Sequence, residues 1–474
     1  MGLFTNVPIR QVFRYSRRMR GDGKCPARSS LCVGRQRLGV EPLRALHRAV
    51  VRTLATPETP GAFYRGWRLM AIDGVVMDVP DSAANASFGR STGGRGDGAF
   101  PQVRKVSLVE LGTHVELAFV EGGYHDGETT LARQLFDHLP TDSLLLEDRG
   151  FFGYEDWKTL HSRVKLLVRG KINLVLKPIQ TLSDGSYLAK IYPSEKARRK
   201  DQEGIVVRVI DYTLDDPQRT GHGVTHRLLT NLLDETEAPA LELIELYHER
   251  WEEELVFDEQ KTHQDPRRAE KPAQLRSETP DGVRQELYAL SLGHFVIRSL
   301  MFEAARPLGL DVDRLSFVNC FRILQCRLPE CDSRTAASLQ DWYQALLAEF
   351  RHENIGPRRN RINPRVIKRK MCRVENWRGG LGYGLLLFQG FPVCGAMSAC
   401  HAPFPVPAHR TGQADFSRRA GTLGQGGTLR HTSRSCPSDS SRSRATPPTA
   451  PGRIGLLGFR QCPGPVLLPA LSLN

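Results

Sequence analysis

The chain has 474 residues, 40% of them hydrophobic and 25% charged, which is ordinary for a globular protein and allows two or three domains. It contains no run of 18 apolar residues and no apolar N-terminal segment, so the sequence predicts neither a transmembrane helix nor a secretory signal. The ten Cys lack paired metal-ligand spacing and are typical of free thiols in a reducing cytoplasm. The net charge of +14 indicates a polyanionic partner.

The N-terminal part of the chain carries weak signals. Residues 1–34 are basic and irregular, and no element is predicted there. Apolar residues with helical spacing then predict a helix over 40–55. We interpret residues 1–60 as a truncated or altered helical region.

The next hundred residues alternate between strand and helix patterns. They predict a strand at 68–80, a glycine-rich loop at 89–98, a hairpin of strands 102–111 and 114–121, a helix at 128–138, a strand at 143–148, a helix at 153–161 and a strand at 164–169. This order is that of an α/β fold with a ribonuclease-H-like core, whose first part we place at 61–169.

The core pattern is interrupted once and then resumes. Short alternating runs at Ile172–Leu176, Ser186–Tyr192 and Ile205–Tyr212 predict a β-rich insertion over 170–224. A strand at His226–Leu232 and helices through residue 305 complete the core at 225–305. A helical and basic region is expected at 306–372, with a helix at Leu339–Arg351.

The positive charge gathers towards the C-terminus. Seven of the fourteen residues from Pro357 to Lys370 are basic, which makes this stretch a candidate for phosphate contact. From Arg373 onward eleven Arg, no Lys and three acids contribute +8, and Gly, Pro and Ser replace any periodic pattern. Residues 373–474 are predicted to be disordered. An Arg-rich, Lys-free composition suits a GC-rich coding region read out of frame, so we interpret this tail as a frameshifted or read-through extension.

The stretch 241–263 contains neither Gly nor Pro and predicts one continuous helix. On such a helix Tyr247, Arg250, Glu254 and Lys261 fall within a stripe of roughly 60°. Glu254 could hold a divalent metal on this face while Arg250 and Lys261 bind phosphates. A solvated charged face is the alternative, because the helix is rich in Glu.

The spacing Tyr-x2-Arg-x3-Glu-x6-Lys is the YREK signature, and through it the chain resembles the insertion-sequence DDE transposases of the insertion element 4 family. The resemblance spans roughly residues 35 to 370. Four segments carry it in the family's order: GVEPLRALHRAVVRTLATPETPGAFYRGWRLMAIDGVVMDVPDSAANASFGR, LLLEDRGFFGYE, ELYHERWEEELVFDEQKTH and RRNRINPRVIKRK.

The resemblance implies a catalytic and metal-binding triad of Asp73, Asp148 and Glu254. Asp73 matches the first motif, although Val75 stands where the family often has Thr or Ser, and Asp148 matches the second in Asp148-Arg149-Gly150. Acids that converge at one sheet edge suit hard cations, so Mg²⁺ is the expected cofactor, with Mn²⁺ as the expected substitute. Among nearby acids, Glu147 and Asp78 should face away from this site, and Glu128 is expected to be a first-turn acid of its helix.

The resemblance also implies the partners: double-stranded DNA, both terminal inverted repeats and target, bound by a homodimer in a synaptic complex. The candidate DNA-binding residues are Tyr247, Arg250, Lys261, Arg358, Arg359, Arg361, Lys368, Arg369 and Lys370. The expected activity is cleavage at insertion-sequence ends and strand transfer, in the bacterial cytoplasm at the nucleoid. A nuclease without strand transfer and an inactive, degenerate DNA-binding copy remain alternatives.

Overall fold

The computed structural model describes residues 2–15, 24–93, 96–213, 224–248, 250–265, 273–333 and 335–355. By their contacts the described residues all belong to one compact unit. The basic stretch 357–370 and the predicted tail 373–474 lie outside the described residues.

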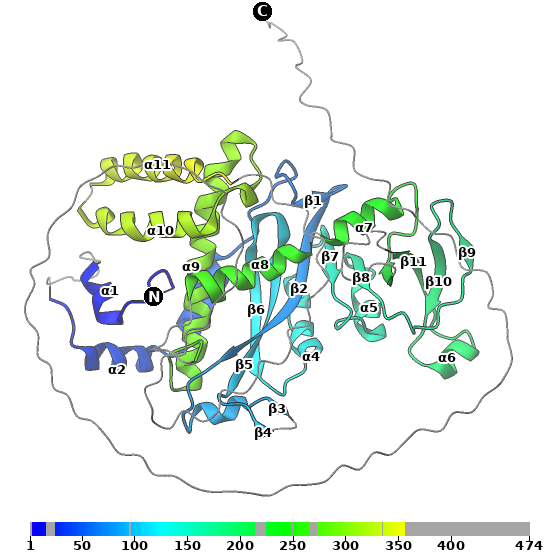
Figure 1. Ribbon diagram of the computed structural model, residues 1–474, viewed down its shortest axis with the longest axis horizontal. Helices are drawn as coiled ribbons and strands as arrows, with labels where there is room; N and C mark the ends of the chain where they lie inside the picture. The colour runs from blue at the N-terminus through cyan, green and yellow to red at the C-terminus, as the bar shows by residue number, and fades with distance from the viewer. Residues whose placement is uncertain are drawn as a thin grey trace, which may run out of the picture. The chain divides into compact units, whose positions relative to one another are not determined.

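A single mixed sheet organises the described part of the chain (Figure 1). Its path runs β6-β5-β2-β7-β8-β12-β11-β10-β9, and β1 pairs with β2 beside this path. The strands are β1 Phe63–Tyr64, β2 Trp67–Asp78, β5 Gln102–Glu110, β6 Val115–Gly123, β7 Ser143–Glu147, β8 Lys165–Arg169, β9 Gln180–Thr181, β10 Tyr187–Ile191, β11 Ile205–Thr213 and β12 Thr225–Thr230; β3 Thr92–Gly93 and β4 Gly96–Asp97 form a separate small hairpin.

The first five strands of this path form the ribonuclease-H-like core. β2, β5 and β6 are consecutive antiparallel neighbours, whereas β7 and β8 run parallel to β2. The turn between β5 and β6 fits against the segment before β2, since a Cβ on Gly112 would lie 2.6 Å from Ala62. The mixed α/β fold expected from the order of the sequence patterns is therefore confirmed.

The insertion continues the same sheet rather than forming a separate one. β12 pairs antiparallel with β8, and β11, β10 and β9 follow outward, each antiparallel to its neighbour. The strand expected at Ile172–Leu176 was wrong. Two of its carbonyls, those of Ile172 and Leu174, accept hydrogen bonds from the Arg227 guanidinium at 3.3 and 3.1 Å, and the backbone turns there.

Helices cover both faces of the sheet and extend beyond it. The α-helices are α1 Ile9–Tyr15, α2 Arg28–Leu38, α3 Glu41–Val50, α4 Glu128–Arg133, α5 Tyr154–Leu160, α6 Glu195–Arg199, α7 Ala240–His248, α8 Trp251–Asp258, α9 Pro280–Ala305, α10 Phe317–Arg327 and α11 Ala336–His352. A π-helix spans Glu259–Gln264, and 3-10 turns span Asn85–Phe88, Leu111–Thr113, Phe136–His138, Arg306–Leu308, Val312–Arg314 and Leu328–Ser333.

The alternation of side chains along β2 divides the core into two layers. Met70 and Ile72 pack with α4 and α5 on one face, whereas Leu69 and Ala71 pack with α7 and α8 on the other. The helices α9, α10 and α11 share a third buried cluster, and α3 packs against α9. The expectation that residues 1–34 contain no element was wrong, because α1 and most of α2 lie there.

Candidate active site at the edge of the parallel strands

The pairing of β2 with β7 places two of the candidate acids beside each other. The last paired residues are Ile72 and Glu147, so Asp73 and Asp148 follow on neighbouring parallel strands. Residues in register share a face, and both acids therefore belong to the face that α7 and α8 cover. Glu147 belongs to the opposite face, as expected. Burial and the nearby Asp156 raise the pKa of Glu147 to about 8.

Asp73 is a largely buried carboxylate beside other charges. The Gly74 N–H donates to its Oδ1 at 2.8 Å, and Arg250 Nη1 lies 3.6 Å from its Oδ2. Its pKa is raised to about 6, mainly by burial; Arg250 and the Gly74 N–H lower it, while Asp148 and Glu128 raise it further. Neighbouring carboxylates disfavour each other's ionisation, and a bound cation would offset the repulsion between their negative charges.

Arg250 connects Glu254, the third candidate acid, to Asp73. The Arg250 Nη2 lies 3.9 Å from Glu254 Oε1, so one guanidinium contacts both Asp73 and Glu254. The Glu254 side chain is 35% exposed and leaves the site open to solvent on this side. The structure thus gathers Asp73, Asp148, Glu254 and Arg250 at one sheet edge. Oxygen ligands from acids on separate elements are the donor set that a hard divalent cation prefers, so these residues fit such a metal.

The segment that carries the YREK residues is not one continuous helix, and that expectation is corrected. α7 ends at His248, the Arg250 N–H donates to the Tyr247 carbonyl at 3.3 Å in a turn, and α8 begins at Trp251. The π-helix that starts at Glu259 changes the helical period again before Lys261. The four residues are therefore brought together by tertiary contacts rather than by a single straight stripe.

Tyr247 and Lys261 are directed at the backbone of β7 and β2. The buried Tyr247 hydroxyl donates to the Glu147 carbonyl at 3.3 Å, and the Lys261 ammonium donates to the Val76 carbonyl at 2.9 Å. Burial raises the pKa of Tyr247 well above its usual range. Both side chains thus hold the α7–α8 segment against β2 and β7, a role that the spacing of the motif did not predict.

Comparison with known proteins agrees with this geometry. Residues 65–292, which contain all three acids, match the family model of the transposase DDE domain. The transposase InsG for insertion sequence element IS4 from Escherichia coli (strain K12) is 28% identical over 376 residues, which are 78% of this chain and 83% of InsG. These matches support a DDE transposase of the insertion element 4 family.

Other similarities to this transposase are more limited. The InsZ protein of Escherichia coli (strain K12) is 29% identical over 164 residues, 33% of this chain and 54% of InsZ. A cryo-EM structure of the piggyBac transposase synaptic complex with hairpin DNA has a TM-score of 0.32 at 10% identity, over 60% of this chain and 53% of that chain.

One acid of this transposase lies nearer the site than its sequence position indicated. Glu128 begins α4, as expected for a first-turn acid, and pairs with Arg104 at 2.7 Å. It also contributes to the raised pKa of Asp73. A Cβ on Gly74 would lie 3.1 Å from Glu128 Oε1, so the glycine after Asp73 makes room for this carboxylate. Nothing in the sequence pattern marked that approach.

A second group with metal-ligand spacing includes Glu252 of α8. The ligand atoms of His114, Glu252 and Asp313 are all within 4.8 Å of one another. Arg298 contacts His114 Nδ1, and its Nη1 lies 3.8 Å from Asp313 Oδ1. A guanidinium thus already supplies positive charge to this buried group, which makes it a weaker candidate for a metal than the Asp73 site.

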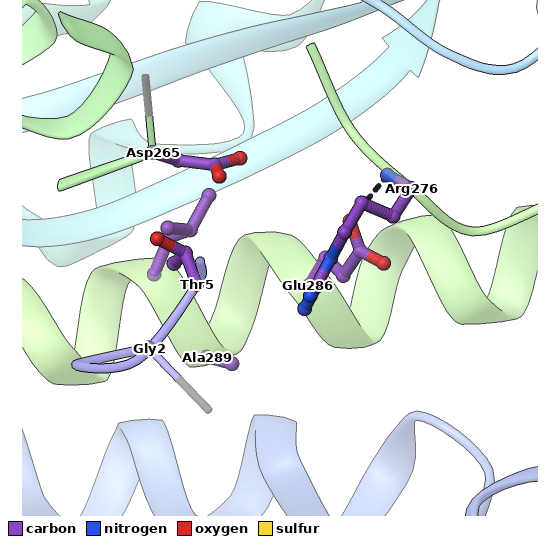
Figure 2. A pocket seen from close by; sticks show the side chains of 7 residues that line it. Gly2, Thr5, Asp265, Arg276, Glu286 and Ala289 are labelled. Carbon is purple, nitrogen blue, oxygen red and sulfur yellow. Dashed lines mark hydrogen bonds between the residues drawn. The ribbon is translucent and has the colours of Figure 1, made fainter. Parts of the chain in front are cut away.

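A small cavity lies elsewhere, between the N-terminal residues and α9. Figure 2 shows Gly2 and Thr5 facing Glu286 and Ala289 of α9, and the Arg276 N–H donating to Glu286 Oε2 at 2.8 Å. Its volume of about 10 Å³ admits no more than a single water. It therefore does not compete with the acids as a substrate site. No helix among the described residues is long and apolar enough to cross a membrane.

Proposed function

We propose that this transposase cleaves DNA at the ends of an insertion sequence and transfers the freed strands into target DNA. Asp73, Asp148 and Glu254 would hold Mg²⁺, or Mn²⁺ in its place. The observation that supports this most directly is the placement of Asp73 and Asp148 on adjacent parallel strands, with Arg250 joining Asp73 to Glu254. Two carboxylates at such an edge and a third on a covering helix suit phosphodiester chemistry.

Several residues of the protein would have separate roles at the scissile phosphate. When bound, divalent cations activate the attacking oxygen and stabilise the leaving oxygen. Arg250 would contact a phosphate of the cleaved strand and offset its charge, because its guanidinium already lies between two of the acids. Lys261 and Tyr247 would contribute near the same strand end, although Lys261 would first have to leave the Val76 carbonyl.

Recognition of the DNA would extend beyond these residues. The basic residues Arg358, Arg359, Arg361, Lys368, Arg369 and Lys370 would contact phosphates without reading bases. The active assembly would be a homodimer that holds two transposon ends, acting on bacterial DNA at the nucleoid.

The test is cleavage and joining of a duplex that carries the terminal repeats of the element, with Mg²⁺ or Mn²⁺. The full chain is compared with Asp148→Ala and with Asp137→Asn, a matched control whose carboxylate is 94% exposed on the short turn before β7. Cutting at the element boundary and joining to target that vanish only in Asp148→Ala are the expected result.

Each other outcome favours a different activity. Cutting without joining would favour a nuclease that lacks strand transfer. Binding of the repeats without cutting, by a chain that is folded by circular dichroism, would identify a degenerate DNA-binding copy and refute the proposal.

A further inference from the structure

The placement of Glu254 depends on a short helix with breaks at both ends. α8 has eight residues, follows a turn at Arg250 and passes directly into the π-helix. A helix this short has little stability of its own and takes its orientation from its contacts. The direction of the Glu254 carboxylate is therefore set by whatever fixes the rotation of α8 about its axis.

The side of this segment away from Glu254 is held by a buried charged cluster. Glu252 and Glu259 are seven residues apart and so lie close to one face, whereas Glu254 lies about 200° around the helix from Glu252. His114 Nε2 is 3.7 Å from Glu252 Oε2, and His114 Nδ1 is 3.4 Å from Glu259 Oε1. His114 belongs to the turn between β5 and β6, so the catalytic sheet contacts the segment directly.

Glu259 connects the same segment to the long helix α9. Its Oε2 accepts from Arg298 Nε at 2.9 Å and lies 2.9 Å from His294 Nε2. The carboxylate is buried, which alone would raise its pKa, yet Arg298, His114 and His294 hold the pKa of Glu259 well below its usual range. A buried carboxylate with three charged or polar partners is fixed in direction, since losing any of them leaves uncompensated charge.

The next two residues of the π-helix are anchored to other elements. Gln260 accepts from the buried Lys105 ammonium at 2.8 Å and donates to Glu116 Oε2 at 3.1 Å, on β5 and β6. Lys261 reaches the Val76 carbonyl on β2. Three successive side chains thus contact α9, the hairpin and the catalytic strand, which a π-helix permits by changing the angular step between residues.

We propose that Glu259, Arg298 and His114 are positioning residues, which set the rotation of α8 and so place the Glu254 carboxylate opposite Asp73 for the divalent cation. The inference rests on the proposed function, because it presumes that Glu254 is a metal ligand. His114, Glu252 and Asp313 are spaced as metal ligands are. In this cluster the Arg298 guanidinium supplies the positive charge that a metal ion would otherwise supply. Loosening the cluster should weaken metal binding without removing any ligand.

The experiment compares Arg298→Lys with Arg208→Lys in the full chain. Arg208 is a matched control: it is equally buried, donates to Ser186 Oγ at 2.8 Å, pairs with Asp184, and lies on β11, outside the α8 contacts. Lysine keeps the charge at both positions but loses the forked hydrogen bonding. Mn²⁺ binding is measured by electron paramagnetic resonance, and the melting temperature of each variant is recorded.

We expect Arg298→Lys to weaken, by about tenfold or more, the Mn²⁺ binding that Asp148→Ala abolishes. A misplaced Glu254 carboxylate should cost about as much metal affinity as losing a hydrogen bond to a metal ligand, which typically costs 10–100-fold. Arg208→Lys should leave this affinity unchanged even where its melting temperature falls as far. Cleavage by Arg298→Lys should recover at high Mn²⁺. His114→Gln serves as the second variant if Arg298→Lys does not fold.

Four outcomes would overturn the proposal. If the cluster variants bound Mn²⁺ as tightly as the wild type, or if Arg208→Lys weakened Mn²⁺ binding as much as Arg298→Lys, the cluster would only stabilise the fold. If Arg298→Lys lost a Mn²⁺-binding event that Asp148→Ala retained, the cluster itself would be the metal site. Wild-type protein that lacks any Mn²⁺ binding dependent on Asp148 would refute the proposed function, and this inference with it.

Discussion

His47 should make the stability of this transposase fall in mild acid. It is a buried residue of α3, its Nε2 lies 2.9 Å from the Ser291 hydroxyl of α9, and the rings of Phe119 and Tyr288 pack edge-on against it. Burial lowers its pKa from 6.5 to about 4; Glu116 opposes the shift, while Lys105, His138 and Arg48 add to it. The folded protein therefore keeps His47 neutral over a range in which the unfolded chain is protonated.

The size and sign of the effect follow from these two pKa values. The unfolded chain binds more protons between pH 6.5 and 4, so stability is full above pH 6.5 and declines as the pH falls towards 4. At pH 5.0 protonation of this one group raises the equilibrium constant for unfolding about 30-fold, which lowers the free energy of unfolding by about 2 kcal/mol. At pH 7.5 the effect is almost zero.

Urea denaturation at pH 7.5 and 5.0 measures this contribution. Wild-type protein should lose about 2 kcal/mol more unfolding free energy between the two pH values than His47→Gln, whose side chain does not titrate. His125→Gln, at an exposed histidine, is the control and should behave as wild type. The reasoning is refuted if wild type and His47→Gln lose the same amount.

Three further predictions concern the site and the core. Arg250→Gln should tighten Mn²⁺ binding several-fold in the absence of DNA while reducing cleavage, since it removes a guanidinium 3.6 Å from Asp73 and 3.9 Å from Glu254, the two proposed ligands; unchanged affinity by electron paramagnetic resonance would contradict this. Leu145→Ala, in the fully buried centre of β7, should cost about 2–5 kcal/mol of unfolding free energy in urea, and a loss under 1 kcal/mol would show a loosely packed sheet. Thr279→Ala removes the side-chain oxygen that accepts from Gly282 N at the start of α9 and should cost about 1 kcal/mol by the same assay, whereas Thr279→Ser should cost little.

The sequence predicted the strands that carry the candidate acids well, because these strands are local and strongly patterned. The apolar run that ends in Glu147-Asp148 and the long strand around Asp73 both lie within a residue or two of their observed limits. Strand alternation also placed Glu147 on the face away from the site. The register that sets Asp148 beside Asp73 is a long-range pairing, and only the family resemblance indicated it beforehand.

The errors arose where polar tertiary contacts decide the structure. α2 has no buried residue and no apolar stripe; Arg35 attaches it to α9 by donating to Gln285 Oε1 at 2.7 Å and to the Gly282 carbonyl at 2.6 Å. Hydrophobic periodicity cannot reveal a helix docked in this way. The break after His248 and the π-helix likewise follow from the contacts of Tyr247, Glu259 and Lys261, since no Gly or Pro marks them.

The continuity of the sheet through β12 has a consequence for how such a protein can vary. A parallel strand such as β8 would leave its outer hydrogen-bonding groups exposed if the core ended there, and exposed strand edges invite aggregation. β12 pairs with that edge, and the outermost described strand on this side, β9, has only two residues. Growth or loss of chain beyond β12 is therefore possible at the periphery, several strands from Asp73 and Asp148, without shifting the pairing that holds them together.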